Sequence, residues 1–155
     1  MPTILEKSNF VNVIASVAIR EGFRYLLVKE AKKEVQGLWN FPTGKVEYGE
    51  SLIKAAEREV KEETGFECKI VGISGINYFY WNDMPGFTVR FNFIGERVSK
   101  MAESLAKDVL GISWFTIKEI QEMDAKKQLR SKTTVSQYKE LIKGLVFPLS
   151  ILSEP

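Results

Sequence analysis

The chain has 155 residues, of which 45% are hydrophobic and 27% are charged, and its formal net charge is only +2. This composition is typical of a globular protein and excludes a disordered or fibrous chain. A balance of 22 basic against 20 acidic side chains gives no strong field that would attract a nucleic acid or a membrane surface. The length suits one domain over residues 1–155, with room for a sizeable core.

The sequence contains a single cysteine, Cys68, and no histidine. The usual zinc ligand sets and the Ser/His or Cys/His catalytic pairs therefore cannot form. Cys68 lies in an alternating apolar stretch, which favours a buried structural thiol over a reactive one. The first ten residues lack a basic stretch followed by an apolar run, and no apolar stretch is long enough to span a bilayer. We expect a cytoplasmic protein.

The first half of the chain predicts a hairpin followed by one well-capped helix. Apolar stretches at residues 11–20 and 24–29 predict two strands, and Gly22 allows the turn between them. A polar loop at 30–36 precedes a strand-like segment at 38–42 and an irregular segment at 43–49. The clearest helix is predicted at 51–64, because Ser51 can cap its N-terminus and Gly65 can end it in a left-handed conformation.

The second half predicts more strands and two helices. Strands are expected at residues 68–74, 76–81 and 87–96, and a polar connection at 99–108 leads to a short strand near 112–115. A helix at about 117–123 and a C-terminal helix at about 131–145 follow, and Pro148 should stop the latter. No repeat or linker divides the sequence.

Three carboxylates share one face of the predicted helix at 51–64. Positions three and four apart are neighbours on a helix, so Glu59, Glu62 and Glu63 fall within an arc of about 100° at the edge of the apolar face. Like charges placed there are unfavourable, and a divalent cation would remove that penalty. Oxygen ligands without histidine or thiolate suit a hard ion such as Mg²⁺ or Mn²⁺. The alternative is a solvated helix whose glutamates pair with Arg58 and Lys61.

The residues around this helix follow a known pattern. From Gly44, five residues lead to Glu50, seven more lead to Arg58-Glu59, and the segment continues Val60-Lys61-Glu62-Glu63-Thr64-Gly65-Phe66. This arrangement resembles the Nudix box at each defining position, although Thr43 replaces the small residue usual before the box glycine. The resemblance implies an α/β fold, a Nudix-type α/β/α sandwich with a mixed central sheet. Its core would cover about residues 11–123, with the helix at 131–145 added.

The resemblance also implies roles for individual residues. Glu59, Glu62, Glu63 and the main-chain carbonyl of Gly44 would hold Mg²⁺ or Mn²⁺. Arg58 and Glu50 would orient the ligands by charge-assisted hydrogen bonds. Because histidine is absent, the general base must be a carboxylate or a metal-bound hydroxide, and Glu62 is our first choice.

An acidic residue outside the box can contribute in such enzymes. Asp108 stands where relatives often carry an additional acidic metal ligand, and Glu96 is the weaker candidate. The alternative for Asp108 is a loop-capping role, because aspartate is common in turns. The catalytic set implied by the resemblance is thus Glu62, Glu59, Arg58 and Asp108.

Aromatic and basic residues outside the box admit two interpretations each. Four aromatics near the ends of two strands could stack on a nucleobase, but core packing is the more ordinary role: Tyr78, Tyr80, Trp81 and Phe87. Arg90 alternates with phenylalanines and could meet phosphate, although an exposed sheet face is the simpler explanation. Four basic residues near the last helix are most simply solvated: Lys126, Lys127, Arg130 and Lys132.

The expected activity is hydrolysis of a phosphoanhydride bond in a nucleoside diphosphate linked to another moiety, including nucleoside triphosphates. Segments 38–40 and 129–131 resemble small bacterial nucleotide phosphatases. Two alternatives stay open: a catalytically silent nucleotide sensor of the same fold, and an enzyme that trims 5′ pyrophosphates from RNA. The expected partner is a nucleotide or another small molecule containing pyrophosphate, with no membrane; the near-neutral charge disfavours nucleic acid. A homodimer is an open alternative.

Overall fold

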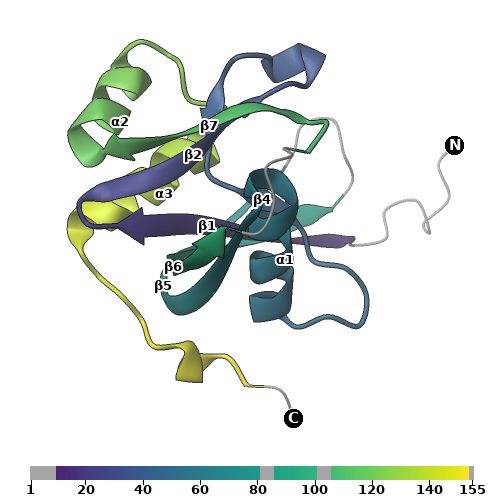
Figure 1. The fold of residues 1–155 in the computed structure, drawn as a ribbon. Helices are drawn as coiled ribbons and strands as arrows, with labels where there is room; N and C mark the ends of the chain where they lie inside the picture. The colour runs from purple at the N-terminus through teal and green to yellow at the C-terminus, as the bar shows by residue number, and fades with distance from the viewer. Residues whose placement is uncertain (1–9, 81–85, 101–105, 154–155) are drawn as a thin grey trace, which may run out of the picture.

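A computed structural model of the protein describes residues 10–80, 86–100 and 106–153. Strands form one mixed sheet, and helices lie against both of its faces (Figure 1). The strands are β1 (Val11–Glu21), β2 (Arg24–Glu30), β3 (Trp39–Asn40), β4 (Thr43–Lys45), β5 (Phe66–Tyr80), β6 (Phe87–Lys100) and β7 (Val109–Thr116). The helices are α1 (Leu52–Thr64), α2 (Ile117–Ala125) and α3 (Lys132–Lys143), with short 3-10 turns η2 (Lys33–Val35) and η3 (Leu149–Ile151).

Strand β1 is the centre of the sheet. It pairs antiparallel with β2 and β4 and parallel with β6, from Val11 opposite Phe87 to Arg20 opposite Glu96. The order β3-β2-β1-β6-β5 then places β5 at an edge, and β7 pairs with β2. The combination of parallel and antiparallel pairs confirms the predicted α/β fold with a mixed central sheet.

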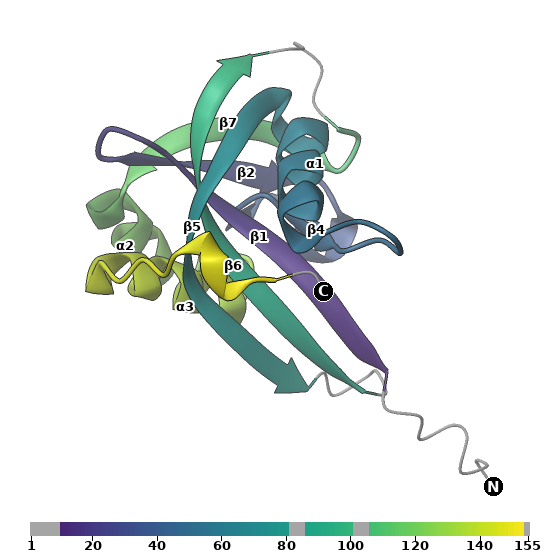
Figure 2. The same cartoon turned by 90° about the horizontal axis from the view of Figure 1, so that it is seen from below.

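Alternation along β1 divides the core between the two faces of the sheet. Ala15, Val17 and Ile19 belong to one apolar cluster with Ala56 and Val60 of α1. Ala18 points the other way, into a cluster with Ile120 of α2 and Tyr138 of α3. Successive side chains of a strand point to opposite faces, so α1 covers one face and α2 with α3 covers the other, as the turned view in Figure 2 shows.

The predicted helix caps are present. The side chain of Ser51 accepts a hydrogen bond from the N–H of Lys54, and Gly65 has φ 72° in the left-handed region. The last helix begins after Ser131 as expected, but Gly144 at φ 69° ends it before Pro148 is reached. No helix in the part of the chain that the structure describes is long and apolar enough to cross a membrane.

Three sequence predictions about strands need correction. The two strands expected at 68–74 and 76–81 are one strand, β5, because register shifts beside Gly72 and Gly75 let the pairing with β6 continue. Trp81 lies outside the described residues. The segment at 43–49 is not wholly irregular, since β4 pairs with β1. The polar loop at 30–36 contains η2, and its first residue, Glu30, is the last of β2.

Candidate functional site

The first residues at the site are Gly44 of β4 and Glu59 of α1. Pairing with β1 places Gly44 opposite Ala15, and α1 packs across the same face of the sheet. A Cβ atom added at Gly44 would collide with the Glu59 carboxylate. Glycine is therefore required here for close approach, and the structure brings the main chain of Gly44 and the carboxylate of Glu59 together.

Arg58 ties the carboxylates to the loop that precedes α1. Its Nη2 and Nε donate to the two carboxylate oxygens of Glu50 at 2.7 and 3.0 Å. Its Nη1 donates to Glu59 at 2.8 Å and to Glu62 at 3.2 Å, and Nη2 also donates to the carbonyl of Lys45. The hydrogen bond from Arg58 holds the pKa of Glu50 below its usual value, and Glu50 in turn raises the pKa of Arg58.

Glu63 lies deeper beside the same strand. The backbone N–H of Thr43 donates to its carboxylate at 3.3 Å. Burial raises the pKa of Glu63 to about 8, and the charge of Glu59 adds to this rise. Burial also raises the pKa of Glu59, which Arg58 only partly offsets. Two carboxylates thus share a poorly solvated space without enough positive charge to balance them.

These residues fit a hard divalent cation by their chemistry. The donors are carboxylate and carbonyl oxygens, the ligands that Mg²⁺ and Mn²⁺ prefer, and a cation would offset the desolvation that raises both pKa values. Glu59 and Glu63 are close together, whereas Glu62 keeps 57% of its side chain exposed and is bonded to Arg58. Within residues 10–80, 86–100 and 106–153, no three acidic, cysteine or histidine side chains converge in the rotamers present.

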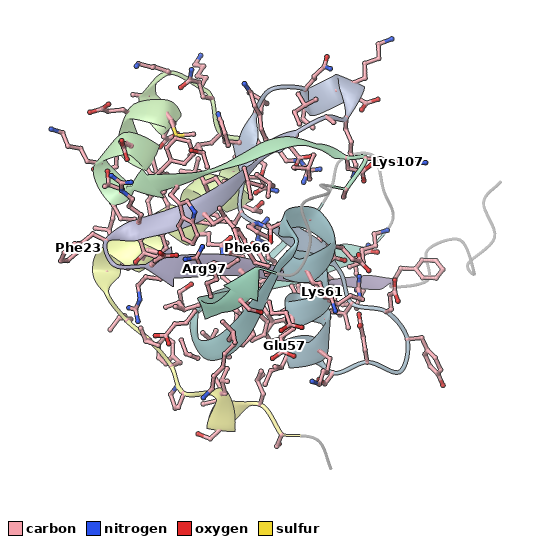
Figure 3. All side chains as sticks on the ribbon, viewed as in Figure 1. Phe23, Glu57, Lys61, Phe66, Arg97 and Lys107 are labelled. Atoms are coloured by element: carbon pink, nitrogen blue, oxygen red, sulfur yellow. The ribbon has the colours of Figure 1, made fainter. Side chains whose placement is uncertain are left out.

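The opposite side of α1 is different. Lys54 and Lys61 are exposed, and Lys54 pairs with Glu57 at 3.3 Å. Figure 3 labels Glu57 and Lys61 on this helix. The solvated-helix interpretation therefore describes this outer side, whereas Glu59 and Glu63 are turned toward β4.

The two acidic residues suggested outside the box form ion pairs of their own. Asp108 keeps 64% of its side chain exposed and pairs with Lys32 at 3.8 Å. Its carbonyl accepts a hydrogen bond from Ala31, so it joins the chain before β7 to the end of β2. Glu96 pairs with Arg20 at 3.3 Å and is half exposed. Among the described residues, no hydrogen bond or ion pair joins either of them to Glu59, Glu62 or Glu63.

A different carboxylate outside the box is buried, and the sequence analysis did not identify it. Glu30, at the end of β2, is 7% exposed and accepts a hydrogen bond from the side chain of Asn40. Arg130 lies against it, with Nε 3.4 Å from the Glu30 carboxylate. The expectation that Arg130 is simply solvated is therefore wrong. The only sequence signal for a buried carboxylate was that Glu30 follows directly after a predicted apolar strand.

A second polar region lies between the sheet and α3. We call it the polar layer, and its members are Ser16, Asn77, Arg90, Asn92, Gln137 and Glu140. The expectation of an exposed sheet face at Arg90 is wrong, because Arg90 is only 3% exposed. Burial lowers its pKa to about 10, and the charge of Arg130 adds to this effect.

The polar layer is closely hydrogen-bonded. Arg90 donates to Ser16, Asn92 and Gln137 at 2.7 to 2.9 Å, and also to Thr133 of α3. Ser16 is within hydrogen-bonding distance of Thr43, whose N–H reaches Glu63. Among the described residues, the Nε2 atom of Gln137 is a buried side-chain atom without a hydrogen-bond partner. The layer therefore connects the first turn of α3 to the strand that carries Gly44.

A cleft opens between β5 and the start of α3. Its volume is about 630 Å³, and its lining combines residues 76–80 with Ser131, Lys132, Thr133 and Ser136. Tyr78 and Tyr80 are 77% and 75% exposed, so core packing is wrong for both of them. Phe87 is partly buried, with its ring 5.9 Å from that of Tyr80. Aromatic and hydroxyl groups are thus available to a ligand in the cleft.

Comparisons with known proteins agree on one family. The model of the family described as the NUDIX domain matches residues 11–137. The chain is 30% identical over 112 residues to the 8-oxo-dGDP phosphatase of Mus musculus, an alignment that covers 70% of this chain and 33% of that protein. It is 38% identical over 60 residues to the CTP pyrophosphohydrolase of Escherichia coli, with 39% of this chain and 44% of that protein covered.

A solved structure is similar over nearly its whole length. The NUDIX hydrolase from Nitrosomonas europaea superposes with a TM-score of 0.85 at 31% identity, covering 94% of this chain and 98% of that chain. By contrast, this chain spans about a third of the length of the mouse relative. The fold and family comparisons therefore extend beyond the segment from Gly44 to Phe66.

Proposed function

This chain belongs to the Nudix family of hydrolases, and from that premise we propose that it cuts a phosphoanhydride bond with the help of a divalent cation. The substrate is a nucleoside diphosphate linked to another moiety, a class that includes nucleoside triphosphates. One observation carries the proposal: Glu59 and Glu63 are crowded beside Gly44, and burial raises the pKa of both. A bound cation gives a physical reason for keeping two such carboxylates together.

The residues that would hold Mg²⁺ or Mn²⁺ are Glu59, Glu62, Glu63 and the carbonyl of Gly44. A cation held by these residues would supply charge that neutralises phosphate oxygens and would lower the pKa of a bound water. Arg58 keeps Glu59 and Glu62 oriented through hydrogen bonds of 2.8 and 3.2 Å. Glu62 is the most exposed of the three glutamates. In our proposal it accepts a proton from the attacking water.

The cleft beside α3 would hold the part of the substrate away from the cut bond. Its volume of about 630 Å³ lies within the usual range of small-molecule sites. Tyr78, Phe79 and Tyr80 line one side, and stacking of a nucleobase on an aromatic ring is worth ~1–3 kcal/mol. The relatives named for 8-oxo-dGDP and CTP support a nucleotide as the substrate.

Helix α3 belongs to the same functional unit in this proposal. Glu140 of α3 accepts hydrogen bonds from Asn77 and Asn92 of the sheet, and Gln137 accepts from Ser16. We therefore treat residues 11–123 and the C-terminal helix as one domain. The buried, lone Cys68 supports the reduced, cytoplasmic location that we expect.

The decisive test is a panel of nucleoside diphosphates, triphosphates and dinucleotides assayed with Mg²⁺ or Mn²⁺, with phosphate and pyrophosphate measured separately. Turnover should require the metal and stop when a chelator is added. Full turnover in metal-free buffer would contradict the proposed role of the carboxylates. Tight nucleotide binding without turnover would instead identify a sensor, and hydrolysis confined to 5′-triphosphorylated RNA would identify an RNA-processing enzyme.

A further inference from the structure

Arg130 lies in the turn between α2 and α3, which is fastened to β3. The N–H of Arg130 donates to the carbonyl of Trp39 at 2.9 Å, and the N–H of Trp39 donates to the carbonyl of Gln128 at the same distance. Leu129 also forms a bridge with Trp39. The backbone of Arg130 is therefore fixed relative to the strand that leads to Gly44.

The side chain of Arg130 forms one ion pair, with Glu30, through its Nε atom, and no described partner engages its two terminal nitrogens. Its Nε lies 3.4 Å from the carboxylate of Glu30, which is itself buried and bonded to Asn40. Within the part of the chain that the structure describes, no other side-chain hydrogen bond or ion pair holds the guanidinium. About a third of the side chain, 32%, is exposed. The two terminal nitrogens can therefore donate to a ligand while Glu30 keeps the group in place.

Arg130 connects, through its backbone bonds to Trp39 and its place before Ser131, a segment beside the carboxylates with the lining of the cleft. On one side, the segment that begins at Trp39 continues to Thr43 and Gly44, which contact Glu63 and Glu59. On the other side, the residues directly after Arg130 line the cleft: Ser131, Lys132 and Thr133. Arg130 therefore belongs to the stretch of chain that links the carboxylate site to the cleft, the two places that one extended ligand would occupy.

The charges around Arg130 agree with this position. Burial is the main cause of the altered pKa values of both Glu63 and Arg90, but the charge of Arg130 lowers both of them as well. One guanidinium thus acts electrostatically on the deepest glutamate of α1 and on the buried arginine of the polar layer. It lies within reach of both regions.

We propose that Arg130 binds the phosphate groups of the substrate, and that Glu30 is the positioning residue that aims it. This inference rests on the proposed function, because it assumes a substrate that carries a diphosphate. Arginine presents several N–H donors in a planar fork that matches phosphate oxygens, and its charge persists at any physiological pH. The buried carboxylate of Glu30 removes freedom from the side chain before the ligand arrives, which lowers the entropy lost on binding.

The test uses methylenediphosphonate, which has the charge of a diphosphate but a bridging carbon that cannot be hydrolysed. Its affinity for the whole chain is measured by calorimetry with Mg²⁺ present. Arg130→Gln should weaken binding about 10- to 100-fold, in the range of one or two hydrogen bonds to a charged group. The affinity of Arg130→Lys should lie between those of the wild type and Arg130→Gln, because lysine keeps the positive charge but lacks the planar fork of N–H donors. Lys126→Gln, an exposed basic residue in the same turn, is the matched control and should bind as the wild type does.

A double variant distinguishes phosphate binding by Arg130 from a role in which Arg130 only neutralises the charge of Glu30. Arg130→Gln leaves the buried carboxylate without its cation, which can destabilise the fold by itself. In Glu30→Gln combined with Arg130→Gln, that unpaired charge is gone, so stability should recover while diphosphonate binding stays weak. Binding that returns to the wild-type level in the double variant would overturn the inference, because Arg130 would then serve only to balance Glu30.

The remaining outcomes distinguish this inference from the proposed function. If nucleotides are hydrolysed and Arg130→Gln changes neither KM nor diphosphonate affinity, Arg130 is not a phosphate ligand although the function stands. If the wild type binds diphosphonate, Arg130→Gln loses it and no nucleotide is turned over, the function fails while the binding site stands. A wild type that does not bind diphosphonate at all also overturns the inference.

Discussion

The carboxylate site beside α1 and the polar layer beneath α3 place polar groups in the protein interior in opposite ways. Beside α1, burial raises the pKa of both Glu59 and Glu63, the charge of Glu59 adds to the rise at Glu63, and Arg58 is the cation bonded to Glu59. Beneath α3, one buried arginine is held by neutral oxygen atoms of Ser16, Asn92 and Gln137. The first region is under electrostatic strain that a cation can relieve, whereas the second is nearly satisfied as it stands.

The first prediction tests the carboxylate site beside α1 and has the largest expected effect. Glu62→Gln or Glu63→Gln should reduce kcat by about 10²- to 10⁴-fold, the range in which a catalytic carboxylate contributes. The fold should survive, because each change removes a like-charge contact on α1. Steady-state kinetics and thermal melting measured on the same samples check both halves of the prediction.

Glu57→Gln is the matched control for that experiment. Glu57 belongs to the same helix but pairs outward with Lys54, so its substitution should leave kcat unchanged. A large loss of melting temperature in metal-free Glu63→Gln would mean that Glu63 has a structural role, and the difference between the two polar regions would disappear.

The second prediction concerns the close approach of β4 to α1. Gly44→Ala should lower kcat by roughly 10²-fold, because its Cβ would displace the Glu59 carboxylate, and small misplacements at a catalytic centre cost about this much. Gly111→Ala is the control, since a Cβ at that position meets nothing within 4 Å. Metal affinity should fall together with activity in Gly44→Ala. A variant with normal activity would show that Glu59 does not need its present position.

The two regions also differ in how far the sequence could predict them. Arg58 bonds to residues four and eight positions away, Glu62 and Glu50, so the spacing of one short segment contains the whole arrangement. The bonds of the polar layer join residues 47 positions apart, as in Arg90 and Gln137, or 121 apart, as in Ser16 and Gln137. Such contacts depend on how β6 and α3 meet across the sheet, which no local pattern specifies.

The same reasoning explains which elements of the fold were predicted. Local signals predict three of these elements. Ser51 marks the start of α1, Gly22 marks the turn between β1 and β2, and Ser131 marks the start of α3. The continuity of β5 does not, because Gly72 and Gly75 resemble chain breaks until β6 supplies a partner. Gly75 also leaves room for the Glu140 carboxylate, a packing reason that becomes visible only in the folded chain.

The third prediction uses the pH dependence of the metal-free protein. The pKa of Glu63 in the folded state, about 8, lies above its usual value, so the folded state holds this proton more tightly than the unfolded state does. The stability linked to Glu63 is therefore fully present at low pH and is lost as the pH rises from about 5 to 8. In chelator, the melting temperature should fall by a few degrees over this interval. Glu63→Gln should flatten the profile, and a wild-type profile that rises over the same interval would contradict the assignment.

The last prediction, with the smallest expected effect, concerns the acidic residues outside the box. Asp108 is largely exposed and pairs with Lys32, and exposed ion pairs contribute little, about 0–1 kcal/mol. Asp108→Asn should therefore change kcat less than about threefold and leave metal binding intact, and Glu96→Gln should behave likewise.

The double variant of Asp108 and Glu96 is needed because two residues that share a role would show a loss larger than the sum of the single effects. A loss of 10²-fold or more in Asp108→Asn would instead make Asp108 the general base and Glu62 only a metal ligand. The carboxylate site would then extend beyond α1 and would include the residue just before β7.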